Sequence, residues 1–274
     1  MKVAYLGPDG SFTHAVASRS FSYDELVPSA NITEVIKFYE NGSVDYAIVP
    51  VENSIEGSVH ETLDYLFHHD DIEAVAEIIQ PIKQQLLAID THRPIEKILS
   101  HPQAIAQGKQ YIETHYPHAT IETTASTAYA ARYVAEHPEL ALAAIAPLQA
   151  ANTYHLQVIA KNIQEIDENY TRFWVLGKNA PHLSLTKESS KITLALTLPD
   201  NIPGALYKAL SVFAWRNIDL TKIESRPLKT VLGEYFFIID LLVLEEKVIT
   251  YALEELKTLG ITSKILGNYQ VYRI

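Results

Sequence analysis

The chain of 274 residues contains no cysteine. This absence excludes a disulfide framework, a thiolate nucleophile and cysteine-ligated zinc. Basic residues are also few, because 22 lysines and arginines stand against 33 aspartates and glutamates, for a formal net charge of −11. The basic residues form no cluster, so neither a nucleic acid nor an anionic membrane is an expected partner.

Long hydrophobic runs are missing as well. The longest, such as residues 235–244, have the length of a strand and fall well short of the roughly 20 residues that cross a membrane. The first residues, MKVAYLGPDG, lack an apolar stretch suited to a signal peptide. We therefore expect a cytoplasmic protein that binds no membrane.

The sequence also lacks the usual fingerprints of nucleotide, hydrolase and metal chemistry. We find no P-loop, no GxGxxG, no GxSxG and no HExxH, and the 11 histidines are scattered. We therefore expect neither a cofactor nor a metal, and the partner we expect is a small molecule.

The pattern of apolar residues divides the chain into two domains, in line with its length. Residues 1–178 alternate short β-rich runs with helical stretches, which is typical of an α/β domain. Residues 179–190 are polar without an apolar period and predict a linker. Residues 191–274 predict the order βαββαβ, typical of a ferredoxin-like module with two helices on one face of an antiparallel sheet.

Polar turns between predicted strands and helices are candidate anion sites. A helix start presents N–H groups without a partner in the helix, and in an open α/β sheet such turns converge beyond the carboxyl ends of the strands. Such turns occur at residues 7–14, 52–58, 100–103 and 124–128. The other interpretation of each turn is an ordinary helix N-cap, provided in order by Ser11, Ser58, Ser100 and Ser126.

The segment NYTRFWVLG at 169–177 places a hydroxyl and a guanidinium side by side before an apolar strand. Arg172 can hold a carboxylate through two parallel hydrogen bonds. A structural salt bridge at the edge of a strand fits the same pattern. Both interpretations stay open at this point.

In order, spacing and residue identity, these segments resemble those of prephenate dehydratases along essentially the whole chain. The catalytic signatures of that family resemble GPDGSFTHAVA (7–17), VPVENSIEGSVHETLDYL (49–66), SHPQAIAQGKQYI (100–112), STAYAAR (126–132), AAIAPLQAANTYHL (143–156) and TRF (171–173). Segments 200–210 and 220–229 resemble the regulatory ACT domain of the same enzymes. Tyr129 and Pro147 depart from the residues usual in the family. The chain is thus similar to a monofunctional prephenate dehydratase with a C-terminal ACT domain.

This resemblance implies a two-lobed, periplasmic-binding-protein-like catalytic domain that converts prephenate to phenylpyruvate in a cleft between its lobes. The implied catalytic residues are Asn53, Ser100, Gln107 and Thr171, and Arg172 and Phe173 complete the TRF motif. Of the turn residues discussed above, Ser11, Ser126 and Thr127 are our candidates for substrate binding.

Departure of hydroxide from prephenate needs a hydrogen-bond donor, for which Thr171 is our candidate. An alcohol is too weak an acid to supply the net proton, so a water or a nearby histidine, His14 or His101, would have to do so. A solvated position at a helix start is the interpretation that we favour for both histidines. We expect Arg172 and the helix-start amides to hold the pyruvyl carboxylate, and the ring carboxylate to lie in a poorly solvated place. The side chains that would orient the ring are Asn53, Ser100 and Gln107.

For the second domain the resemblance implies allosteric inhibition by L-phenylalanine, bound between two ACT domains of a homodimer or homotetramer. The implied ligands on one domain are Asn201, Gly204, Ala205 and Leu206, and those on the other are Glu224, Ser225 and Arg226. Without the resemblance, a helix-start proline and a surface ion pair explain the same residues.

Two other classes of protein share parts of this pattern. A solute-binding module would hold a keto or amino acid in a two-lobed cleft, but the chain shows no export signal. An amino acid sensor linked to transcription would need a DNA-binding element, and the sequence has neither a basic helix nor a basic patch.

Overall fold

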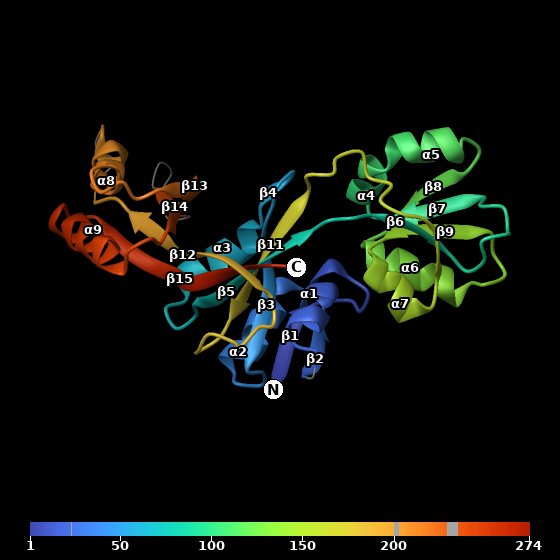
Figure 1. Cartoon of the computed structure of the whole chain (residues 1–274), viewed down its shortest axis with the longest axis horizontal. Coiled ribbons are helices and arrows are strands. Elements are labelled where there is room, and N and C mark those ends of the chain that lie inside the picture. Colours follow the sequence, from blue (N-terminus) through green and yellow to red (C-terminus); the bar gives the residue numbers. More distant parts are fainter. Residues whose placement is uncertain (23, 200–202, 229–234) are drawn as a thin grey trace. The chain divides into compact units, whose positions relative to one another are not determined.

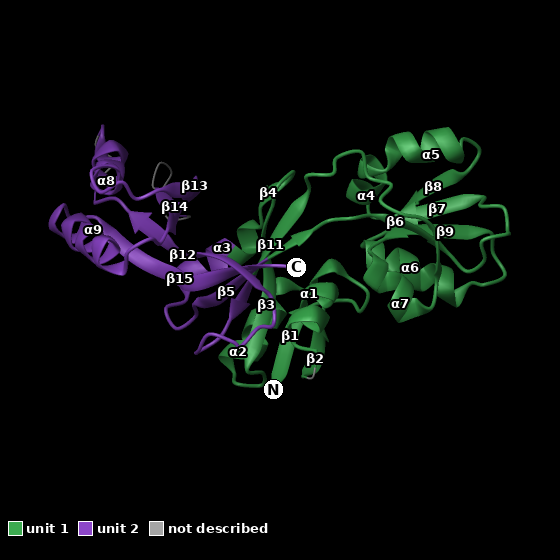
Figure 2. Ribbon diagram, viewed as in Figure 1, with its two compact units in different colours: residues 1–62, 79–173, 274 green, residues 63–78, 174–273 purple. Residues whose placement is uncertain are grey.

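The structure is a computed structural model, and it describes residues 1–22, 24–199, 203–228 and 235–274. The described chain forms two compact units (Figure 2). Unit 1 comprises residues 1–62, 79–173 and 274, and unit 2 comprises residues 63–78 and 174–273. Residues 63–78, which we placed in the first domain, thus pack with the C-terminal module, because long-range contacts rather than chain order decide their neighbours.

The first part of unit 1 is a parallel α/β arrangement. Strand β1 lies between β2 and β3 and is parallel to both (Figure 1). Strand β3 then turns back into the short antiparallel strand β4. The elements are β1 (Lys2–Leu6), α1 (Phe12–Ser20), β2 (Glu25–Ser29), α2 (Ile32–Glu40), β3 (Tyr46–Asn53) and β4 (Gly57–Ser58).

The second part of unit 1 is a five-stranded sheet in the order β10-β6-β9-β7-β8. Strand β7 is parallel to β8 and β9, whereas β6 is antiparallel to β9 and β10. Its strands are β6 (Gln85–Ala88), β7 (Lys97–Ser100), β8 (Thr120–Thr123), β9 (Leu142–Ala146) and β10 (Gln157–Ala160). Its helices are α4 (Pro102–Gln107), α5 (Lys109–His115), α6 (Thr127–Glu136) and α7 (Leu148–Tyr154).

The central strands β6, β7 and β9 of this sheet are buried on both faces because they are apolar at successive positions. Along β6, Leu86 packs with helices α4 and α5, and Leu87 packs with helices α6 and α7. In β9 the residue pair Ile145 and Ala146 divides between the same two clusters. Side chains alternate between the faces of a strand, so uninterrupted apolar runs predict a sheet covered on both sides.

Three elements contain residues of both units: α3 (His60–His68), β5 (Ala74–Pro81) and β11 (Tyr170–Leu176). The chain leaves the first sheet of unit 1 after β5 and returns to β11 after β10. Two separate connections therefore join the two α/β parts, as expected for a two-lobed domain. None of the helices in the described ranges is long and apolar enough to cross a membrane.

Unit 2 contains the βαββαβ order that the sequence predicts. Its antiparallel strands follow the order β13-β14-β12-β15. The elements are β12 (Thr186–Thr197), α8 (Ala205–Ala214), β13 (Leu220–Pro227), β14 (Tyr235–Leu242), α9 (Glu246–Thr258) and β15 (Thr262–Arg273). Strand β12 begins inside the expected linker, because residues 186–190 pair with the end of β15 and so form a strand despite their polar sequence.

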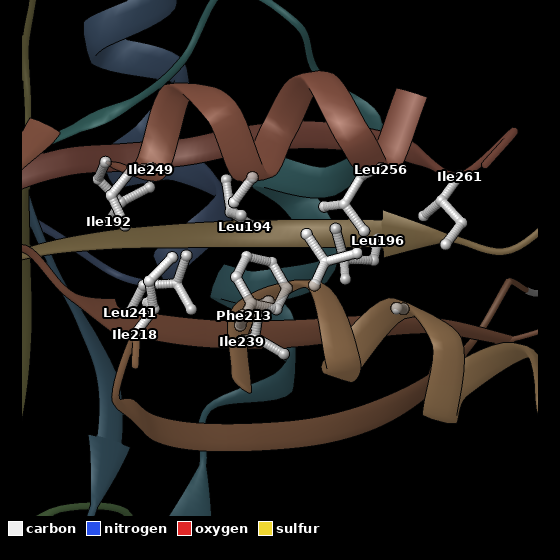
Figure 3. Packing of buried hydrophobic residues seen from close by; sticks show 13 residues of the cluster. Ile192, Leu194, Leu196, Phe213, Ile218, Ile239, Leu241, Ile249, Leu256 and Ile261 are labelled. Carbon is white, nitrogen blue, oxygen red and sulfur yellow. The ribbon is translucent and has the colours of Figure 1, made fainter. Parts of the chain in front are cut away.

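The core of unit 2 lies between this sheet and helices α8 and α9 (Figure 3). Ile192, Leu194 and Leu196 of β12 point toward the helices, where Phe213 and Leu256 pack against them. The alternation of these residues along β12 explains why one face of the sheet is apolar.

The opposite face of the same sheet carries a buried polar row. Thr193 Oγ1 donates a hydrogen bond of 2.7 Å to Asp240 Oδ1 and lies 2.6 Å from the hydroxyl of Tyr269. Trp174 Nε1 donates to both Tyr269 and the fully buried Glu77, at 3.2 Å each. Buried polar groups cost free energy unless they are paired, and these groups pair with one another.

Candidate functional site

A cavity of about 350 Å³ lies in unit 1. Its wall is formed by the turn after β1, the turn after β3, helix α4, the start of α6 and strand β11. Of the nine residues that we expected at the site of catalysis, the cavity is lined by Ser11, Asn53, Gln107, Ser126, Thr127, Thr171 and Phe173. Segments that are far apart in the sequence thus meet at one site.

Thr171 is held by a network centred on Asn53. The Nδ2 group of Asn53 donates to Thr171 Oγ1 at 2.9 Å, to Asn169 Oδ1 at 2.9 Å and to the carbonyl of Tyr170 at 3.2 Å. Because Thr171 Oγ1 accepts from Asn53, its own hydrogen can be directed toward a molecule in the cavity. The arrangement makes Thr171 a positioned donor.

Arg172 is not among the residues that line the cavity, and its role as a substrate clamp stays a prediction. Thr171 and Phe173 both face the cavity from β11, and successive side chains of a strand point to opposite faces. Arg172 therefore points away and forms an ion pair with Glu52, and both side chains are largely buried. The structure thus contains an ion pair of the kind that the salt-bridge interpretation describes, and carboxylate binding by Arg172 stays a prediction.

Ser100 is a second residue that the structure places away from the cavity. It is the last residue of β7, is fully buried and donates to the carbonyl of Ile145 at 2.6 Å. The N-cap of the following helix is His101, which lines the cavity itself. The hydroxyl of Ser100 thus ties β7 to β9 and supports the strand that carries His101.

Two helix starts meet the cavity. Ser11 caps α1 and accepts from the N–H of His14 at 3.1 Å, and Ser126 caps α6 and accepts from the N–H of Tyr129 at 3.0 Å. Thr127 is the first residue of α6. Both helices are nine residues or longer, and the first N–H groups of a helix carry a partial positive charge. The N-cap and the anion-site interpretations are therefore compatible at these two turns.

Histidine 14 lies outside the cavity lining, although it follows the same turn. His14 Nδ1 accepts from the N–H of Gly10 at 2.8 Å, and its ring stacks on Tyr5 with 5.2 Å between centroids. Burial lowers the pKa of His14, against the opposing effect of Asp9. Gly10 has φ of 81° and approaches Ala150 and Tyr154 closely, so a side chain at this position would be strained. His14 therefore supports the turn in its neutral form.

Glu56, which the sequence motifs did not single out, is a titratable residue of the cavity. Burial raises the pKa of the Glu56 carboxyl group, against the opposing effects of His101 and a hydrogen bond with Gln107. Gln107 Oε1 also accepts from Gln84 Nε2 at 3.1 Å. A signal was present, because Glu56 is the carboxylate nearest the tip of the polar turn at 52–58.

The lining residues define the chemistry of the cavity. They are hydroxyl, amide and apolar side chains together with Glu56 and His101, and the lining residues that the structure describes include no lysine or arginine. Within the described ranges no group of three or more histidine, aspartate or glutamate side chains could hold a metal ion. The cavity can thus bind a small anion through helix starts and donate hydrogen bonds to it.

The residues expected to bind an effector occupy two faces of unit 2. Arg226 is buried and pairs with Asp64 of α3 at 2.9 Å, and Glu224 lies 3.9 Å from Arg226. Ser225 is exposed on the other face of β13, as strand alternation requires. The residues Gly204, Ala205 and Leu206 lie at the start of α8, where Gly204 has φ of 83°, and Asn201 lies outside the described residues. A direct effector contact by Arg226 would compete with its ion pair.

A family model and several relatives show the family of the chain. The family described as prephenate dehydratase matches residues 3–181. The prephenate dehydratase of Lactococcus lactis subsp. lactis (strain IL1403) is 52% identical over 276 residues, which cover 100% of this chain and 99% of that protein. The prephenate dehydratase of Bacillus subtilis (strain 168) is 43% identical over 285 residues and covers 100% of both. A solved structure, the prephenate dehydratase of Arthrobacter aurescens in complex with L-Phe, is 32% identical with a TM-score of 0.83, covering 98% of this chain and 89% of that chain.

Proposed function

The chain belongs to the prephenate dehydratase family of hydro-lyases, and we propose that its cavity converts prephenate to phenylpyruvate, carbon dioxide and water. The observation that carries this proposal is the hydrogen bond from Asn53 to Thr171 at the cavity wall. It leaves the Thr171 hydroxyl directed as a donor, and the departing hydroxide of prephenate is the oxygen that needs one.

The two carboxylates of prephenate need different treatment. Binding that is equally strong in the ground state and in the transition state does not raise kcat. Tight binding therefore suits the pyruvyl carboxylate, which stays in the product, and not the ring carboxylate, which leaves. The starts of α1 and α6 provide it, through the amides beside Ser11 and Ser126. The apolar lining, which includes Ile82 and Phe173, solvates the ring carboxylate poorly and favours its loss as neutral carbon dioxide. The Asn53 and Gln107 amides orient the ring.

A turnover assay tests the proposed function. We expect the purified chain to convert prephenate into a product with the alkaline enolate absorbance of phenylpyruvate, above an enzyme-free blank. A solute-binding module would instead bind prephenate in calorimetry and release it unchanged. Binding without product would refute the proposed function.

We also propose that unit 2 is an ACT domain through which L-phenylalanine inhibits the enzyme. Two observations support this: the βαββαβ order of its elements, and the relative that was solved in complex with L-Phe. The start of α8 at Gly204 is exposed and suited to an amino acid carboxylate. An effector acts only if it binds one conformation better, so inhibition and binding must appear together. Activity and calorimetric heat are measured against the concentration of L-phenylalanine, with L-leucine as the control. No inhibition together with no heat of binding would refute this proposal.

The assembly we propose is a cytoplasmic homodimer or homotetramer. Exposed aromatic residues in unit 2 support association: Tyr207 of α8 is 76% exposed, Tyr251 of α9 59%, and Trp215 directly after α8 83%. Large exposed apolar side chains gathered on one module are typical of a protein interface. Light scattering measures the mass directly, and a monomer at all concentrations would refute this assembly.

A further inference from the structure

Glu56 is attached to the catalytic network through its own backbone. The N–H groups of Ile55 and Glu56 donate to Asn53 Oδ1 at 3.0 and 3.2 Å. The Nδ2 group of the same Asn53 donates to Thr171 Oγ1. One side chain therefore holds both the turn that carries a carboxyl group and the strand that carries the hydroxyl donor, and both groups line one cavity.

The surroundings of the Glu56 carboxyl group suit a group that gives up a proton. Because Gln107 Oε1 accepts from Gln84, the Nε2 group of Gln107 is the donor toward Glu56. His101 Nδ1 accepts from the N–H of Gln103 at 3.4 Å, which places the proton of the neutral ring on Nε2. Burial favours the protonated acid before the reaction, and the Gln107 amide together with His101 stabilises the carboxylate afterwards.

The reaction itself requires such a donor. As the bond to the ring carboxylate breaks, its electron pair moves through the ring and expels the hydroxyl oxygen. Carbon dioxide leaves neutral, and the dianion becomes a monoanion, so the expelled oxygen must take up one proton to leave as water. A threonine hydroxyl is too weak an acid to be the source near neutral pH. Among the described lining residues, Glu56 provides the carboxyl group and His101 the imidazole.

We propose that Glu56 is the general acid that delivers this proton to the departing hydroxyl, while Thr171 donates a hydrogen bond to the same oxygen. This inference rests on the proposed function. His101 and Gln107 face the Glu56 carboxyl group and tune it, and solvent returns the proton after each turnover. Glu56 is active when protonated, so kcat/KM falls as the pH rises through its raised pKa.

The test compares Glu56→Gln with wild type in a pH series, using an enzyme-free blank at each pH to remove acid-driven conversion. We expect Glu56→Gln to lower kcat by about 10²- to 10⁴-fold, the usual contribution of a general acid, with little change in KM. The alkaline fall of kcat/KM should disappear in this variant, and Glu56→Asp should regain part of the lost rate. Glu25→Gln makes the same chemical change on an exposed residue outside the cavity and should behave as wild type.

Each other result overturns the inference. Wild-type kcat in Glu56→Gln excludes Glu56 as the acid, and so does a slow variant that keeps the alkaline fall. If His101→Asn removes that fall and Glu56→Gln does not, the imidazole is the donor. These results require an active wild type and so leave the proposed function standing, whereas a wild type without turnover overturns both.

Discussion

Replacing Thr171 by valine removes one hydroxyl from the cavity and keeps the size and branching of the side chain. Valine favours strands, so β11 should retain its conformation. Asn53 Nδ2 loses one acceptor but keeps the Asn169 side chain at 2.9 Å and the Tyr170 carbonyl at 3.2 Å. The lost hydrogen bond should lower the free energy of unfolding by about 0.5–1.5 kcal/mol, too little to unfold the protein.

The effect of Thr171→Val on catalysis should be much larger than its effect on stability. Loss of one positioned donor to a developing oxyanion typically lowers kcat by about 10²- to 10³-fold, or about 2.7–4 kcal/mol. KM should change little, because the hydroxyl acts on the departing oxygen, whereas the helix starts hold the pyruvyl carboxylate. Initial rates of phenylpyruvate formation over a range of prephenate concentrations separate the two constants.

Thr171→Ser is the matched control, because it keeps the hydroxyl and loses only a methyl group. It should retain most of the activity, and urea unfolding should show all three proteins to be folded at the assay temperature. A Thr171→Val variant that is folded and has near-wild-type kcat would refute the role of this hydroxyl.

Three further predictions concern buried and paired groups. Thr193→Val should lower the free energy of unfolding by about 1.5–3 kcal/mol in urea, because the buried Asp240 carboxylate loses the hydrogen bond from this hydroxyl, and an unchanged midpoint would contradict this. Burial depresses the pKa of His14 below 6.5, so the unfolded chain binds more protons and stability should fall as the pH drops below that value. Thermal midpoints should show a weaker fall in His14→Asn, and equal slopes would be inconsistent with this origin. Arg172→Met and Glu52→Gln should reduce kcat/KM similarly, since both substitutions break the same ion pair. A rise in KM in the arginine variant alone would instead support direct binding of the substrate by Arg172.

The succession of elements was largely predictable from local sequence. Apolar alternation along residues 192–196 predicts a strand with one buried face, and Ile192, Leu194 and Leu196 do pack against the helices. The polar stretch at 186–190 was misread as a linker, because its strand conformation depends on pairing with β15 and not on its own composition. Residues 63–78 likewise have partners that are distant in the sequence, such as Arg226 for Asp64 and Lys264 for the carbonyl of Phe67.

A motif predicted a residue of the candidate site correctly only where the side chain of that residue lies on the face of the strand or helix that borders the cavity. Thr171 and Phe173 reach the cavity, but Arg172 between them cannot, because strand β11 begins at Tyr170 and its side chains alternate. A helix cap was one of two interpretations of Ser100, but the strand continues to that residue and His101 takes the cap position. Neighbouring residues of a motif can thus have separate roles. Which residue has which role depends on the face of the strand to which its side chain points.

The sequence by itself determined the α/β character of unit 1, the βαββαβ order of unit 2 and the family of the chain, because these depend on local periodicity and motif wording. Only the tertiary structure decided that Asn53 joins Thr171 to the turn of Glu56, and that Arg172 pairs with Glu52 instead of lining the cavity. The contact of Asn53 with Thr171 and that of Arg172 with Glu52 each join residues more than 100 positions apart. They depend on which strands lie side by side and which face each side chain takes, and no local pattern encodes that.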